Sequence, residues 1–114
     1  VWMNPADAQV RGLKNGDVVL VKCRRGACLC GLQVSARITP GVVSIQHGAW
    51  FEPENTPAGR IDVHGNANTI AIDVITSKIA RGNVSSPGNV EVSLWKDEVP
   101  PVRIFNQPRR VTAV

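Results

Sequence analysis

Short runs of Val, Ile and other apolar residues, separated by frequent turn signals, are the feature that most restricts the fold of this chain. Ten glycines and eight prolines in 114 residues interrupt these runs every few positions. β-branched residues between closely spaced turn residues favour strands over helices. With 43% hydrophobic and 19% charged residues, the chain has enough apolar surface for one compact domain and too little charge for disorder. We therefore expect a single, mainly β domain.

One short helix is expected near the start of the chain. Asn4 suits an N-cap, Pro5 suits the first helical position, and Gly12 suits the stop after about two turns. The dipeptide Asn15-Gly16 then predicts a tight turn that leads into a strand.

About six strands are expected, beginning with the apolar opening Val1-Trp2-Met3. The other predicted strands span residues 18–23, 28–38, 42–45, 69–72 and 89–95. Residues 52–68 are rich in Pro, Gly, Asn and charge, and are expected to form a long loop that serves a site. Residues 1–95 are thus predicted to form a small β-barrel, followed by an extended, proline-containing tail over residues 96–114.

The net charge of +4 permits an anionic partner, which includes nucleic acid, a phosphate-bearing cofactor and an acidic neighbouring domain. Arg24-Arg25 and Arg109-Arg110 are short pairs, and no basic stripe alternates with aromatic residues. We therefore expect no nucleic-acid partner.

Three cysteines, Cys23, Cys28 and Cys30, fall in one predicted hairpin. A structural zinc site needs about four ligands in paired spacings, and no fourth ligand is near in the sequence. Cys28 and Cys30 are two residues apart and so share one face of a strand. We expect these cysteines to be buried strand residues, and no residue of the chain to bind metal.

Three local strings carry more specific information. They are Asn4-Pro5-Ala6-Asp7-Ala8 with residues 11–19, residues 40–43 with residues 48–53, and Asn68 with residues 76–83. In residue type, order and spacing, they resemble the molybdopterin dinucleotide-binding domain of the dimethyl sulfoxide reductase family of molybdenum oxidoreductases. The resemblance covers roughly residues 1–95.

This resemblance implies a double-psi β-barrel with one or two short helices that helps hold two molybdopterin guanine dinucleotides. The metal would be molybdenum or tungsten, and its protein ligand would lie outside this chain. The parent would be an anaerobic-type oxidoreductase, periplasmic or cytoplasmic in a prokaryote, that reduces S-oxides, N-oxides or related substrates. We expect both ends of the chain to be cuts within that longer protein, and the isolated domain to be inactive.

The same resemblance implies the partners of the domain. These are the remaining domains of the parent catalytic subunit, together with an iron–sulfur or membrane-anchor subunit that transfers electrons.

Four of the residues expected to contact the cofactor lie in or beside the long loop. Trp50 and Phe51 match a family segment that runs beside the pterin, although one of them could instead plug the barrel end. His47 precedes that segment and can hydrogen-bond a phosphate or a pterin edge. Asn68 presents both a donor and an acceptor to a pterin or guanine, and the alternative is a turn-forming asparagine.

The other three expected contacts follow later in the chain. Ser77 and Lys78, with Arg81, match a family string in which donors meet phosphate oxygens, and the alternative is a capped turn with solvated charges. Ser86 falls where family members often carry Gln or Lys, and its side chain has a shorter reach. No catalytic residue is expected in this chain.

A second hypothesis belongs to another class of function. It is a stand-alone double-psi barrel that acts as a protein-interaction or substrate-recognition module. A longer parent gene would support the cofactor-binding domain, and a gene of this length alone would support the module.

Overall fold

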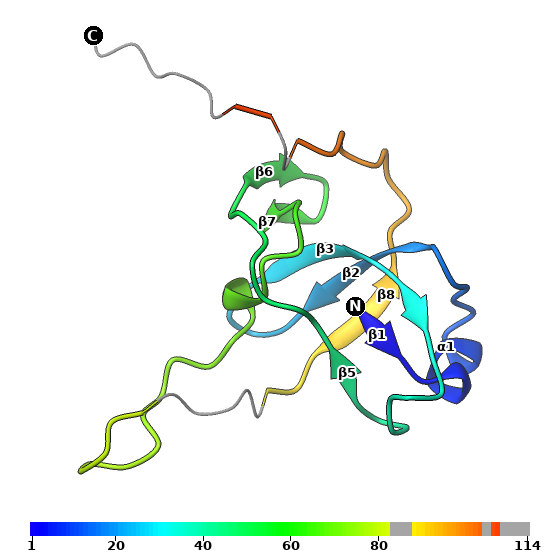
Figure 1. The fold of residues 1–114 in the computed structure, drawn as a ribbon. Helices are drawn as coiled ribbons and strands as arrows, with labels where there is room; N and C mark the ends of the chain where they lie inside the picture. The colour runs from blue at the N-terminus through cyan, green and yellow to red at the C-terminus, as the bar shows by residue number, and fades with distance from the viewer. Residues whose placement is uncertain (83–87, 104–105, 108–114) are drawn as a thin grey trace, which may run out of the picture.

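The computed structural model describes residues 1–82, 88–103 and 106–107. In this part of the chain the protein is mainly β, with two mixed sheets, one short α-helix and one 3-10 helix (Figure 1). The mainly β class expected from the sequence is confirmed. None of the helices in the described ranges has the length and apolar character needed to cross a membrane.

The smaller sheet has three strands in the order β4-β1-β5. The central strand β1 (Trp2–Met3) runs parallel to β4 (Gln33–Val34) and antiparallel to β5 (Val43–Ser44). The apolar opening of the chain is therefore a strand, as expected, and it lies in the middle of a sheet.

The larger sheet has five strands in the order β6-β7-β3-β2-β8. Strands β2 (Val18–Lys22) and β3 (Ala27–Gly31) form an antiparallel hairpin, and β8 (Glu91–Leu94) pairs antiparallel with the other side of β2. On the far side, β7 (Gly59–Asp62) runs parallel to β3 and pairs antiparallel with β6 (Pro53–Thr56). The strands predicted at residues 18–23 and 89–95 are confirmed with shorter bounds.

The strand expected over residues 28–38 is two strands in two different sheets. The chain changes sheet at Leu32, between β3 and β4. The N–H of Leu32 donates to the carbonyl of Asp17, and its carbonyl accepts from the N–H of Gly16, both at 2.8 Å. The single-strand prediction was wrong because the alternation of apolar residues continues unbroken through the change of sheet.

The long loop expected over residues 52–68 contains regular structure, so that prediction was wrong. It holds the β6–β7 hairpin and the 3-10 helix η1 (Ala67–Thr69). Pro53 is tolerated because it begins an edge strand, where a missing N–H removes few ladder bonds. The strand expected over residues 69–72 is also wrong, because the chain leaves η1 through a turn that buries Ile70 in the core.

The predicted helix is confirmed as α1 (Pro5–Val10), with Asn4 as its N-cap. The Oδ1 atom of Asn4 accepts a hydrogen bond from the N–H of Ala6 at 2.9 Å. Its Nδ2 atom donates to the carbonyl of Ile38 at 2.7 Å. The cap therefore also ties the start of the helix to the segment between β4 and β5.

The change Asn4→Ala is expected to lower the free energy of unfolding by about 1–2 kcal/mol, because it removes both the cap and the bond to Ile38. Urea denaturation measures the loss. Gln9→Ala, on the exposed face of the same helix, is the matched control and should stay within about 0.5 kcal/mol of the unchanged protein. Equal losses in the two variants would contradict the assignment of the cap.

Cysteines form part of the core between the sheets. Cys28 and Cys30 are buried, and their Sγ atoms lie 3.8 Å apart. The hydrogen bond between these two thiols, together with burial, raises the pKa of Cys28 far above its usual range. Cys23 is only partly buried and lies just after β2. The expectation of buried strand cysteines is confirmed for Cys28 and Cys30.

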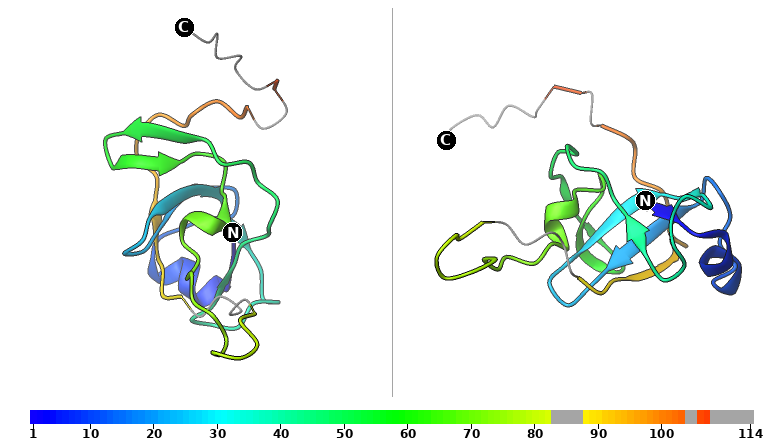
Figure 2. Two further views of the ribbon diagram at one scale, coloured as in Figure 1. Left: turned by 90° about the vertical axis from the view of Figure 1, so that its left-hand side faces the viewer. Right: turned by 60° about the horizontal axis from the view of Figure 1, so that its bottom comes forward.

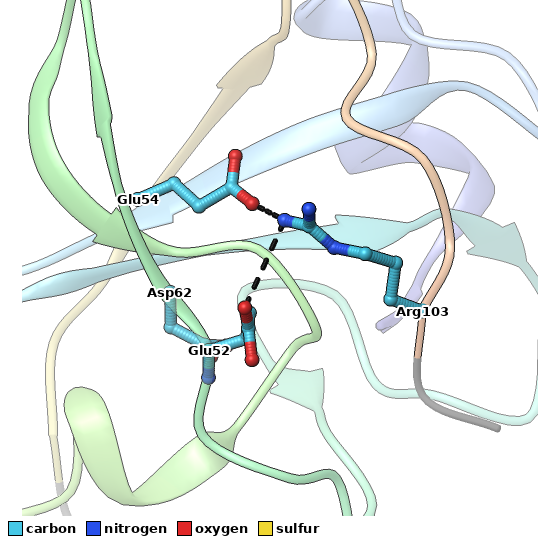
Figure 3. Close-up of polar contacts among 4 residues, drawn as sticks. All are labelled: Glu52, Glu54, Asp62 and Arg103. Atoms are coloured by element: carbon cyan, nitrogen blue, oxygen red, sulfur yellow. Dashed lines mark hydrogen bonds and ion pairs between the residues drawn. The ribbon is translucent and has the colours of Figure 1, made fainter. Parts of the chain in front are cut away.

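After β8 the chain returns to the β6–β7 hairpin. The guanidinium group of Arg103 forms an ion pair with Glu54 and lies 3.8 Å from a carboxylate oxygen of Glu52. Figure 3 shows Arg103 reaching from the tail to both glutamates, with Asp62 beside Glu52. The described part of the tail is thus attached to the edge of the larger sheet.

Candidate functional site

Two neighbouring pockets lie where the two sheets and the segment after β7 meet. The first, which we call the His64 pocket, has a volume of about 540 Å³. The second, the Asn68 pocket, has a volume of about 110 Å³. Ile45 and His47 line both pockets, so the pockets adjoin along the segment that follows β5. Together they offer space for an elongated ligand rather than a single compact one.

The buried carboxylate of Asp62 fixes the segment that carries His64. Asp62 ends β7 and is 1% exposed. Its two oxygens accept hydrogen bonds from the N–H of Glu52 at 2.9 Å and from the N–H of Asn66 at 2.7 Å. Asp62 therefore closes the short loop over residues 62–66 and joins that loop to Glu52, the residue just before β6.

Asn66 links this loop to η1 through two hydrogen bonds. Its Oδ1 atom accepts a hydrogen bond from the N–H of Asn68 at 2.9 Å and caps the 3-10 helix. Its carbonyl accepts from the hydroxyl of Thr69 at 2.8 Å. Asn68 is thus held at a defined place on η1, with an exposed side chain at the Asn68 pocket.

The loop between β2 and β3 supports the other side of η1. A Cβ atom at Gly26 would lie 2.5 Å from the carbonyl oxygen of Thr69, so only glycine allows this close approach. The guanidinium group of Arg25 donates to the carbonyl of Ile70 at 2.7 Å and to that of Ala71 at 3.0 Å. The exit from η1, which lines the Asn68 pocket, is therefore fixed by the first hairpin of the larger sheet.

His64 is a candidate that the sequence analysis missed. It lines the first pocket with His47, and both of its ring nitrogens are shut off from solvent without a hydrogen-bond partner among the described residues. The signal in the sequence was a histidine before the turn residues Gly65-Asn66, inside a segment already expected to serve a site. That signal located the segment but did not single out the residue.

Two of the expected cofactor contacts meet in the structure. His47 and Asn68 both line the Asn68 pocket, although one follows β5 and the other lies on η1. Trp50 and Phe51 are 72% and 60% exposed and line neither of the two pockets. They lie just beyond Ala49, which lines the His64 pocket.

Ser77 and Lys78 lie in a turn away from the two pockets. The Oγ atom of Ser77 accepts a hydrogen bond from the N–H of Ala80 at 2.9 Å, and its carbonyl accepts from the N–H of Arg81 at 3.1 Å. The segment before and within this turn, yellow-green in Figure 1 and in the right view of Figure 2, extends away from the sheets. The structure thus has the turn that was given as the alternative to phosphate contacts. Ser86 lies outside the described residues.

No group of three or more His, Cys, Asp or Glu side chains able to hold a metal ion occurs within residues 1–82, 88–103 and 106–107. The arrangement can bind and orient a ligand. The polar side chains at the two pockets are imidazoles and amides, which offer hydrogen-bond donors and acceptors to a flat, polar molecule.

Comparison with known proteins gives a consistent set of relatives. The chain is 37% identical over 111 residues to the trimethylamine-N-oxide reductase of Vibrio cholerae, which covers 97% of this chain and 14% of the relative. It is 40% identical to trimethylamine-N-oxide reductase 1 of Escherichia coli O157:H7, over 99% of this chain and 13% of the relative. It is 36% identical to the dimethyl sulfoxide/trimethylamine N-oxide reductase of Cereibacter sphaeroides, over 94% of this chain and 13% of the relative.

The chain therefore spans only about 13–14% of the length of the curated relatives it matches, and it corresponds to a small domain of these enzymes. The family model described as "Molydopterin dinucleotide binding domain" matches residues 1–89. The chain belongs to this molybdopterin dinucleotide-binding domain family, and the family and relatives together imply a molybdopterin guanine dinucleotide as its cofactor.

Proposed function

We propose that this domain helps hold bis(molybdopterin guanine dinucleotide) in a larger oxidoreductase that reduces N-oxides, S-oxides or related substrates. The observation that carries the proposal is the meeting of His47 and Asn68 at one pocket beside the larger His64 pocket. Family membership and the printed names of the relatives support the cofactor and the substrate class.

The residues present fit such a cofactor. A volume of about 540 Å³ lies within the range of pockets that bind small molecules and cofactors. An imidazole whose two ring nitrogens are buried without a partner among the described residues, in a pocket with an otherwise largely apolar lining, suits a heterocycle that brings its own donors and acceptors. When bound, the cofactor supplies the metal and the redox chemistry, with the metal's protein ligand outside this chain.

Each expected contact has a proposed part in binding. Asn68 would hydrogen-bond the edge of a pterin or guanine, and His47 would bond the cofactor where the two pockets adjoin. Trp50 and Phe51 would form an exposed aromatic platform beside it. The proposed contacts of Ser77 and Lys78 with the cofactor need the turn after η1 to meet a ligand that extends beyond both pockets. The proposed contact of Ser86 rests on the family resemblance alone.

We also propose that the two sheets are parts of one double-psi β-barrel over residues 1–95, with residues 96–114 as its tail. The change of sheet at Leu32 and the parallel pairs β1–β4 and β3–β7 support this topology, because all three join segments that are not simple hairpins.

The parent protein supplies the rest of the proposed activity. Its other domains would carry the metal ligand, and an iron–sulfur or membrane-anchor subunit would deliver electrons. The domain alone is proposed to be inactive with artificial electron donors. Turnover of trimethylamine N-oxide by the purified 114-residue chain would contradict this assignment.

The change Asn68→Ala in the full-length parent tests the site. The change removes the amide donor and acceptor of Asn68 that would face the polar edge of the ligand. It should weaken cofactor binding by about 1–3 kcal/mol, or roughly five- to hundred-fold. Cofactor and molybdenum content per polypeptide measure the loss. Asn55→Ala, at the exposed position of strand β6, is the matched control and should leave occupancy unchanged. Full occupancy with a markedly lowered melting temperature would instead make Asn68 a structural turn residue.

A further inference from the structure

The backbone around His64 is held at several points, so the position of this residue is well defined. Asp62 bonds the N–H of Asn66, and the N–H of Val63 donates to the carbonyl of Glu52 at 3.0 Å. Gly65 has a φ of +75°, and a Cβ atom there would lie 3.2 Å from the carbonyl oxygen of Leu29. A side chain at residue 65 would be strained, so glycine is what allows the loop to lie this close to β3.

The imidazole of His64 is not satisfied by the rest of the described chain. Both Nδ1 and Nε2 are inaccessible to solvent and lack a hydrogen-bond partner within the described residues. A buried polar group without a partner destabilises a protein, and native structures rarely keep one without a reason. Because the loop backbone is already bonded on both sides, the ring's lack of partners is not explained by a loosely placed segment. Its partners therefore come from outside the described residues.

The lining of the His64 pocket indicates the chemistry of that partner. Among its lining residues, all of which are described, there is no lysine or arginine side chain to pair strongly with a phosphate. The lining instead combines apolar side chains, including Trp2 and Leu29, with glycines and two imidazoles. A neutral imidazole has one donor and one acceptor, which complements the mixed edge of a nitrogen heterocycle.

We propose that His64 is a recognition residue for a nitrogen heterocycle, the pterin or the guanine of the cofactor, and that a small rotation of its ring brings a nitrogen to that edge. This inference rests on the proposed cofactor site. It extends that site from the Asn68 pocket to the adjoining His64 pocket.

Two variants of the full-length parent test the proposal. His64→Leu keeps the approximate volume of the side chain but has no polar atom, whereas His64→Gln keeps a donor and an acceptor. His64→Leu should retain the cofactor roughly five- to hundred-fold less tightly, and His64→Gln should recover most of the binding. Pterin fluorescence and guanosine monophosphate released from the acid-denatured protein measure the cofactor held per polypeptide after dialysis.

Stability without cofactor provides a second readout. Since the imidazole has no partner among the described residues, His64→Leu should leave the melting temperature of the cofactor-free parent unchanged or raise it, while lowering that of the loaded parent. A histidine with a purely structural role would lower both. Unchanged cofactor retention in His64→Leu, or a lowered melting temperature of the cofactor-free variant, would overturn the proposal.

Comparison with Asn68→Ala separates this inference from the proposed function. If Asn68→Ala loses cofactor and His64→Leu does not, the site stands and the role of His64 is wrong. If neither variant loses cofactor, the proposed site itself fails. Titration of the cofactor-free parent with guanosine monophosphate and, separately, with a simple pterin identifies the heterocycle, because only the one that His64 contacts should bind more weakly to His64→Leu. Equal binding of both probes to the variant and the unchanged parent would count against the contact.

Discussion

Replacing Asp62 with alanine is expected to lower the free energy of unfolding by about 2–6 kcal/mol. The change leaves the N–H groups of Glu52 and Asn66 without an acceptor in a partly buried setting, at about 1–3 kcal/mol for each group. Because Asp62 also closes the loop that carries His64, the parent variant should lose cofactor as well. Urea denaturation of the chain and cofactor content of the parent measure the two effects.

The control for this change is Asp73→Ala, which removes the same side chain from an exposed position. It should alter stability by no more than about 0.5 kcal/mol. Asp62→Asn keeps one acceptor oxygen and should lose less stability than Asp62→Ala. A loss below about 1 kcal/mol for Asp62→Ala would show that water replaces the carboxylate at both N–H groups.

The second large effect is expected for Leu32→Ala. Leu32 is 3% exposed, belongs to the main core and lies where the chain changes sheet. Truncating a buried leucine removes apolar contacts and leaves a cavity, which costs about 2–5 kcal/mol. Chemical denaturation followed by circular dichroism measures this loss.

Leu94→Ala is the matched control for Leu32→Ala, because the same side chain is removed from a residue that is 42% exposed on β8. Its loss of stability should be at most about 1 kcal/mol. If both variants lost the same free energy of unfolding, the side chain of Leu32 would contribute no more to the core than an exposed leucine does.

The elements that the sequence predicted well depend on local signals. The helix follows from Asn4 and Pro5, and strand β2 follows from the turn Asn15-Gly16 and the apolar run behind it. In each case the residues that determine the element lie within or beside it. Its bounds were therefore predicted nearly correctly.

The elements that were missed depend on partners far away in the chain. The segment Pro53–Asp62 has a polar composition typical of a loop, yet it forms the β6–β7 hairpin, which joins the sheet where the buried Asp62 pairs with Cys28 of β3. The alternation across Leu32 could not reveal that its two halves join different sheets. Such pairings result from the three-dimensional arrangement and leave little local pattern.

The residues of the candidate site also divide into those that a local motif predicts and those that only the folded structure identifies. His47 and Asn68 could be named from a motif, and the structure brings them to one pocket. His64 could not be named in this way, because it is a candidate only through its two ring nitrogens, which are buried without a partner in the described part of the chain, and only the packed structure reveals this. The roles of all three in binding remain predictions.

The pairing of β8 with β2 has a consequence for choosing the boundaries of this domain. The family match ends at residue 89, whereas β8 begins at Glu91 and pairs with β2 from Val19 to Lys22. A protein cut at residue 89 would contain the whole matched region but leave β2 as an open sheet edge. Its unpaired N–H and carbonyl groups, on a strand rich in valine, would then be available to another chain and would favour aggregation. A useful boundary follows the sheet and includes Trp95.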